Sequence, residues 1–211
     1  KAIGDNEISK YMDIANLLTQ EDFKVTERIE LQIKEGRFPT DEDVQLYNQI
    51  ISKSLLPMGF ITHNAVILFA IDLFVKFPQI KTFYQNYYPL IIVDEFQDTN
   101  SIAWELLKQL ISEKTQLLFL GDPLQRIYGF IGALPDIMNV AAKQYNMTPI
   151  ALTQNYRFRN NQEMLKLDAN IRANAQSEFV YTAKENIASL SAFWGKTQED
   201  EANQIVDKIE L

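Results

Sequence analysis

Two neighbouring carboxylates, Asp94 and Glu95, directly follow the short apolar segment 90–93. A run of this length that is rich in Ile and Val predicts a buried parallel strand covered on both faces, and ligands bind at the carboxyl ends of such strands. Two adjacent acids can divide the work there, because an aspartate can bind a nucleotide-associated Mg²⁺ while a glutamate takes a proton from an attacking water. A core strand that ends in a solvated acidic turn is the alternative on these residues alone.

Two further apolar segments end in side chains that suit phosphate chemistry. Residues 117–120 predict a second buried strand, followed by Gln125, which can position a water or sense a terminal phosphate. Residues 148–152 predict a third strand, followed by Tyr156, which could stack on a purine, and by Arg157, whose planar guanidinium fits phosphate oxygens. The strand–helix–strand spacing of the first two predicts a βαβ unit, so their polar ends should share one sheet edge.

Two aromatic residues, Tyr128 and Phe130, alternate along the segment after Gln125. Alternating aromatic side chains give flat faces on which the bases of a single nucleic-acid strand can stack. Packing of both rings in the core is the alternative, and the two residues alone leave it open.

The elements that position these residues are mostly helical. Residues 1–60 carry apolar residues at helical spacing, and Thr40 with Asp43 resembles a capping box that starts a helix. Residues 62–77 predict an apolar helix buried against a sheet, with His63 in a capping or surface role. The other expected elements are a short aromatic helix near 83–88, a helix capped by Thr99 or Asn100, a helix from Pro135, a helix over 160–174, a strand over 188–194 and a last helix started by Thr197 and Asp200.

Composition bounds the class of protein. The chain has 211 residues, of which 46% are hydrophobic and 23% charged, so it can hold one large or two small globular domains. The absence of cysteine and the single histidine exclude disulfides and a cysteine/histidine zinc site. A net charge of −8 argues against a generally basic surface but permits a local nucleic-acid groove. With no apolar run near the roughly 20 residues that span a bilayer and no signal-peptide core, we expect a cytoplasmic protein without membrane contact.

Three segments resemble, in order and spacing, motifs II, III and IV of the UvrD/Rep-like superfamily 1 DNA helicases. They are 93–99 (VDEFQDT), 121–133 (GDPLQRIYGFIGA) and 154–157 (QNYR). Three long motifs in register make the resemblance specific, and it covers about residues 62–211. It implies an α/β fold of the P-loop NTPase, RecA-like type. Residues 1–60 would be a helical segment, similar to the end of the insertion in the first motor domain; 61–149 would be the C-terminal part of that domain and 150–211 the start of a second RecA-like domain.

The resemblance also implies the ATP-binding roles. Asp94 would bind Mg²⁺, and Glu95 would be the catalytic base. Gln125 would couple the terminal phosphate to the DNA site. From the second motor domain, Arg157 would reach the γ-phosphate and Tyr156 would stack on adenine.

Single-stranded DNA would lie on Tyr128 and Phe130. The sequence departs from the family at two neighbouring positions: many relatives have serine where Arg126 stands, and commonly arginine where Ile131 stands. The second departure removes a polar contact near the aromatic pair, which bears on how bases stack there.

The implied activity is ATP-driven 3′ to 5′ movement on single-stranded DNA with unwinding at duplex junctions, and DNA repair is among the pathways it could serve. No Gly-x-x-x-x-Gly-Lys-Thr/Ser phosphate loop occurs in the 211 residues, the chain starts without methionine, and it stops inside a helical pattern. We therefore expect an internal fragment that lacks ATP hydrolysis by itself. The alternatives are a catalytically silent nucleic-acid-binding or scaffold protein of the same fold, and the helicase subunit of a helicase–nuclease.

Overall fold

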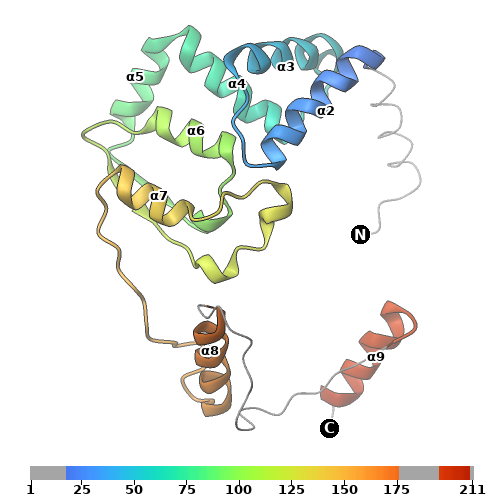
Figure 1. Cartoon of the computed structure of the whole chain (residues 1–211), viewed down its shortest axis with the longest axis vertical. Helices are drawn as coiled ribbons and strands as arrows, with labels where there is room; N and C mark the ends of the chain where they lie inside the picture. The colour runs from blue at the N-terminus through green and yellow to red at the C-terminus, as the bar shows by residue number, and fades with distance from the viewer. Residues whose placement is uncertain (1–17, 176–194, 210–211) are drawn as a thin grey trace. The chain divides into compact units, whose positions relative to one another are not determined.

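A computed structural model describes residues 18–175 and 195–209 of the chain (Figure 1). Within these ranges the chain is mainly helical and contains one two-stranded parallel sheet. It forms two compact units, Lys1–Pro149 and Ile150–Leu211. The α-helices and strands are α2 (Gln20–Lys34), α3 (Asp41–Ser54), α4 (His63–Lys76), α5 (Pro78–Tyr87), β1 (Leu90–Val93), α6 (Ser101–Leu110), β2 (Gln116–Phe119), α7 (Ile137–Gln144), α8 (Gln162–Ala175) and α9 (Gln198–Ile209). Short 3₁₀ turns, η1 (Leu56–Met58), η2 (Phe96–Asp98), η3 (Pro123–Gln125) and η4 (Tyr128–Ile131), lie between them.

Threonine side chains cap the first three described helices. The hydroxyl oxygens of Thr19, Thr40 and Thr62 each accept a hydrogen bond from the backbone N–H three residues later, at 3.1, 3.2 and 3.1 Å. A capping oxygen satisfies one of the backbone donors that a helix start leaves unpaired. The predicted helix start at Thr40 is confirmed, and so are the caps at Asn100 and Thr197, whose side chains accept from Ala103 and Asp200.

One core joins the N-terminal helices to α6. Its buried residues come from α2, α3, the residue after α3, α4 and α6, and comprise Ile29, Ile33, Val44, Tyr47, Ile51, Leu55, Ala65, Leu68 and Ile102.

The buried Tyr47 hydroxyl donates to Glu30 and shares a 2.9 Å hydrogen bond with Thr62. Burial, reinforced by the negative charge of Glu30, raises the pKa of Tyr47 above its ordinary value. At the surface, two hydrogen bonds from the Arg28 guanidinium lower the pKa of Asp43.

The apolar helix α4 packs against helices rather than against the sheet, so the expected environment was wrong. Its contacts are with α3, α5 and α6, and only one of its faces is buried, through Ala65, Leu68, Ile71 and Phe74. Val66 and Val75 on other faces are exposed. His63 is exposed at the first position of the helix, as predicted, and the cap itself is Thr62.

The two strands form the predicted βαβ unit with α6 between them. They pair in parallel, with Leu90 opposite Gln116 and Val93 opposite Phe119. Val93 and Phe119 lie against a second core of Phe96, Trp104, Ile137 and Ala141, in which the rings of Phe96 and Phe119 stack at 4.2 Å. The expectation of cover on both faces was wrong, because Leu90, Ile92 and Leu118 on the opposite face are exposed.

The third predicted strand is absent from residues 148–152, which lie outside every described strand. Ile150 is 82% exposed and Leu152 91% exposed, so no packing surface in the described residues covers them. An apolar run becomes a strand only when another strand supplies hydrogen bonds. The predicted helices at 135 and 160 begin two residues later than expected, at Ile137 and Gln162, and the predicted strand 188–194 lies outside the described residues.

Candidate functional site

The polar ends of β1 and β2 meet at one edge of the sheet. Backbone hydrogen bonds continue past the strands, from Leu120 N to Val93 O and from Phe96 N to Leu120 O, both at 2.8 Å. Asp94 and Glu95 lie at this edge with exposed side chains. The expectation that the two strand ends share an edge is confirmed.

The chain turns sharply at Glu95. Its φ is +51°, in the left-handed region, and its N–H donates to the Asp94 Oδ1 at 2.9 Å. This conformation costs a residue other than glycine about 1–2 kcal/mol, and residues that adopt it are concentrated at functional sites. The turn ends β1 directly at the acid pair and leaves both carboxylates at the surface.

The buried side chain of Gln97 connects the ends of the two strands. Its side chain is almost fully buried; the amide Nε2 donates to the Glu95 Oε2 at 2.7 Å, and the Oε1 accepts from the Asp122 N–H at 3.1 Å. Gly121 makes room for this side chain, since a Cβ at Gly121 would lie 2.4 Å from the Gln97 Oε1. Gln97 is not among the predicted site residues, although an amide that closely follows an acid pair is a signal for a bridging side chain.

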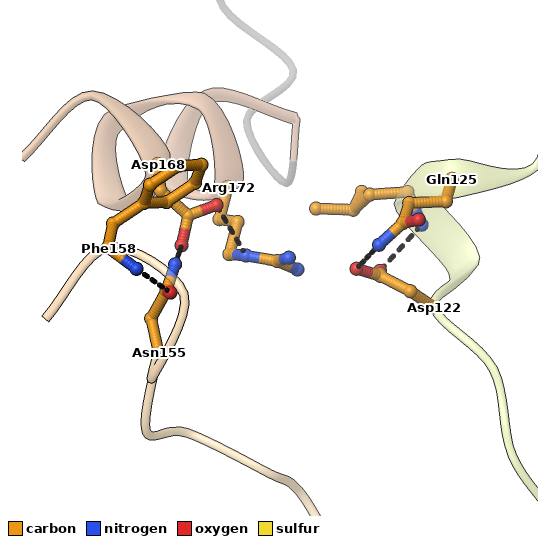
Figure 2. Close-up of polar contacts among 7 residues, drawn as sticks. Asp122, Gln125, Asn155, Phe158, Asp168 and Arg172 are labelled. Atoms are coloured by element: carbon orange, nitrogen blue, oxygen red, sulfur yellow. Dashed lines mark hydrogen bonds and ion pairs between the residues drawn. The ribbon is translucent and has the colours of Figure 1, made fainter. Parts of the chain in front are cut away.

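Gln125 lies in η3, immediately beyond the same edge. Its Nε2 donates to the Asp122 Oδ2 at 3.0 Å, as Figure 2 shows. Because Gln97 binds the backbone of Asp122, hydrogen bonds run continuously from the Glu95 carboxylate through Gln97 and Asp122 to Gln125. The structure therefore brings together three of the predicted site residues, Asp94, Glu95 and Gln125.

An exposed aromatic loop begins within η3 and contains η4. We define the aromatic loop as residues 124–131. Tyr128 is 43% exposed and Phe130 67% exposed, and their ring centroids are 6.2 Å apart. Ile127 and Ile131 beside them are also exposed. Neither aromatic ring packs in a core of the first unit, and the loop offers flat apolar surface to a ligand.

The second unit carries Tyr156 and Arg157 on an irregular segment before α8, and both side chains are exposed. Asn155 organises this segment: its Oδ1 accepts from the Phe158 N–H at 3.0 Å, and its Nδ2 donates to the Asp168 Oδ2 at 3.1 Å (Figure 2). Asp168 in turn accepts from Arg172 at 3.1 Å. The sequence analysis did not single out Asn155, whose role depends on a partner 13 residues away.

Replacing Asn155 with alanine should loosen the turn that presents Arg157. The loss of about 1 kcal/mol of hydrogen bonding predicts roughly fivefold faster amide hydrogen exchange at Phe158. Asn160→Ala, at an exposed position of the same segment, is the matched control and should leave that rate unchanged. Equal rates at Phe158 in wild type and Asn155→Ala would contradict this role.

The carboxylate oxygens at the sheet edge suit a cation that is bound mainly by a nucleotide. They do not form a site that would hold a cation by protein side chains alone. No cluster of three or more metal-ligating side chains occurs in residues 18–175 and 195–209. Asp94 offers a single exposed carboxylate, whose Oδ1 already accepts from the Glu95 N–H. Mg²⁺ retains several waters and is held by one or two carboxylates together with substrate phosphates, so one aspartate suffices.

An acid pair and a glutamine lie at the carboxyl edge of two parallel strands, which is the edge at which α/β proteins bind ligands. Residues 4–146 match the family described as UvrD/REP helicase N-terminal domain. The chain belongs to the UvrD/REP helicase family.

Curated relatives agree with this assignment. The ATP-dependent DNA helicase PcrA of Staphylococcus aureus is 33% identical over 150 residues, which are 68% of this chain and 20% of that protein. PcrA of Bacillus subtilis is 32% identical over 178 residues, 77% of this chain and 23% of the relative. A probable DNA helicase II homolog of Rickettsia conorii is 27% identical over 184 residues, 85% and 28% respectively. The chain thus spans less than a third of the length of these relatives.

Proposed function

We propose that this chain is part of an ATP-dependent DNA helicase or translocase that moves 3′ to 5′ along single-stranded DNA and unwinds duplex at junctions. The observation that carries the proposal is the hydrogen-bonded edge from Glu95 to Gln125, which continues directly into the exposed aromatic loop. Family membership and relatives named ATP-dependent DNA helicases support it. The proposal includes a RecA-like fold for the sheet, domains divided near residues 60 and 149, a cytoplasmic location and a role in DNA repair.

The proposed work at the sheet edge is divided between the two acids. Asp94 would hold the Mg²⁺ of ATP, and the ion would supply charge neutralisation at the phosphates. Glu95 takes the proton of the attacking water, and the buried amide of Gln97 holds its carboxylate in place. Gln125 lies where it can respond to the terminal phosphate, because it is anchored to the same edge through Asp122.

The remaining residues act on the DNA and in the second unit. The flat faces of Tyr128 and Phe130 stack on bases, an interaction that tolerates any sequence. Arg157 would bind phosphate oxygens of ATP, and Tyr156 would stack on adenine. Repeated closure and opening of the two motor domains moves the strand past the aromatic loop.

We expect no ATP hydrolysis by the 211-residue chain itself, since it contains no phosphate loop to bind the β- and γ-phosphates. The measurement is phosphate release with Mg²⁺, with and without single-stranded DNA. Release that is stimulated by DNA and abolished by Glu95→Gln would contradict this expectation.

In a longer protein that contains both this chain and a phosphate loop, ATP hydrolysis tests the proposed function. Glu95→Gln should lower kcat by about 10²–10⁴-fold, the usual contribution of a general base, with little change in nucleotide affinity. The matched control is Glu113→Gln, which changes an exposed acid beyond α6. A longer protein that binds DNA but never hydrolyses ATP would favour the silent nucleic-acid-binding alternative.

A further inference from the structure

The segment that follows the aromatic loop, residues 132–134, is called the loop base here. It is attached to the residues that lead from the acid pair into α6. The Leu134 N–H donates to the Thr99 carbonyl at 2.9 Å, and Ala133 forms an antiparallel bridge with Asn100. Ala133 is buried. These contacts fix one side of the loop base to the segment between the acid pair and α6.

The other side of the loop base lies against the backbone at the end of α2. Gly132 has a φ of +98°, and a Cβ at this position would lie 2.3 Å from the Ile33 carbonyl oxygen and 3.2 Å from the Lys34 Cα. A side chain of any size is excluded there, since both neighbours are backbone atoms. There is a second close approach beside the first. A Cβ at Gly36 would lie 3.2 Å from the Leu134 Cδ2.

The end of α2 and the residues that follow it are themselves held in place. Ser101, the first residue of α6, donates from its buried hydroxyl to the Arg37 carbonyl at 3.0 Å. Ile33 is buried in the same core as Ile102 of α6. The end of α2, the start of α6 and the loop base therefore form one three-way contact.

We propose that the end of α2 and the three residues that follow it, residues 33–37 together, are a positioning element for the aromatic loop. Backbone in direct contact with backbone leaves no gap to absorb movement, so a shift of α2 and α3 must displace Gly132 and, with it, Tyr128 and Phe130. The helical segment thereby sets how the rings face a bound strand. The consequence for DNA rests on the proposed function, whereas the contact between α2 and the loop does not.

The first test compares two glycine substitutions in the full 211-residue chain. Gly132→Ala adds a methyl group against backbone, whereas Gly59→Ala, at a φ of +80° with nothing within 4 Å, imposes conformational strain alone. We expect amide exchange at Ala133 and Leu134 to rise about tenfold in Gly132→Ala and to stay at the wild-type rate in Gly59→Ala. Affinity for an oligo-dT strand should fall about tenfold in Gly132→Ala only, the equivalent of losing one stacked base.

A second variant decides the question even if Gly132→Ala does not fold. Ser101→Ala adds no atom and removes only the hydrogen bond to Arg37. We expect about threefold weaker oligo-dT binding and faster exchange at Leu134, and Ser101→Thr, which keeps the hydroxyl donor, should restore both.

Two outcomes would overturn the inference: wild-type exchange at Ala133 and Leu134 in the folded variants, or faster exchange with unchanged oligo-dT affinity. If the wild-type chain does not bind oligo-dT, the proposed DNA role of the loop fails. The exchange rates then still decide whether α2 holds the loop.

Discussion

Replacing Gly121 with alanine is expected to lower the free energy of unfolding by about 2–4 kcal/mol. The added Cβ would lie 2.4 Å from the Gln97 Oε1 and 3.3 Å from the backbone nitrogens of Phe96 and Gln97. It would force the Gln97 amide out of its buried position, and the hydrogen bonds to Glu95 and Asp122 would break. Urea denaturation followed by far-UV circular dichroism measures the loss.

A double-mutant cycle separates the steric overlap between an alanine at position 121 and the Gln97 side chain from the other destabilising effects of Gly121→Ala. In Gln97→Ala the buried amide is gone, so adding Gly121→Ala should cost less than 1 kcal/mol more, and the two changes should be strongly non-additive. Gly59→Ala serves as the control, with a loss of about 1 kcal/mol from its left-handed backbone alone. Additive effects of Gly121→Ala and Gln97→Ala would show that the bridging role of Gln97 is wrong.

Removing both rings of the aromatic loop, in Tyr128→Ala with Phe130→Ala, is expected to weaken binding of oligo-dT by at least about 30-fold. Base–aromatic stacking contributes about 1–3 kcal/mol per base, and both rings are exposed to a ligand. Fluorescence anisotropy at low salt measures the affinity, and the free energy of unfolding should stay near the wild-type value because neither ring lies in a core.

Helix α5 offers a matched control for this pair. Phe83 is 59% exposed and Tyr87 63% exposed, and their rings stack at 5.7 Å. Changing both to alanine removes a similar aromatic area away from the sheet edge and should alter oligo-dT affinity less than twofold. If the α5 pair weakened binding as much as the loop pair, DNA recognition would be a general property of exposed rings rather than of the loop.

Local features of the fold could be predicted from the sequence. The caps at Thr40, Asn100 and Thr197 depend on residues three positions apart, and all lie where helices begin. The parallel pairing of β1 with β2 follows from the length of the helix between them. The shared edge of Asp94, Glu95 and Gln125 follows directly from that pairing.

Long-range packing could not be predicted in the same way. The periodicity of an apolar helix such as α4 says that it is buried, but not whether helices or a sheet cover it. Residues 148–152 have a strand-like composition without a described pairing partner. Gly121 and Gly132 are required by atoms 24 and 99 residues away, Gln97 and Ile33, and spacing along the chain carries no sign of either contact.

The sheet is covered on one face only, and its exposed face affects how the chain associates with other copies of itself. Leu90, Ile92 and Leu118 present apolar side chains from neighbouring strands to solvent on one face. Contiguous apolar surface of this kind promotes association between chains as concentration rises, and outer strand edges offer backbone groups for pairing. A polar residue in place of Ile92, as in Ile92→Thr, is therefore expected to reduce association between chains, and sedimentation velocity over a concentration series measures the change.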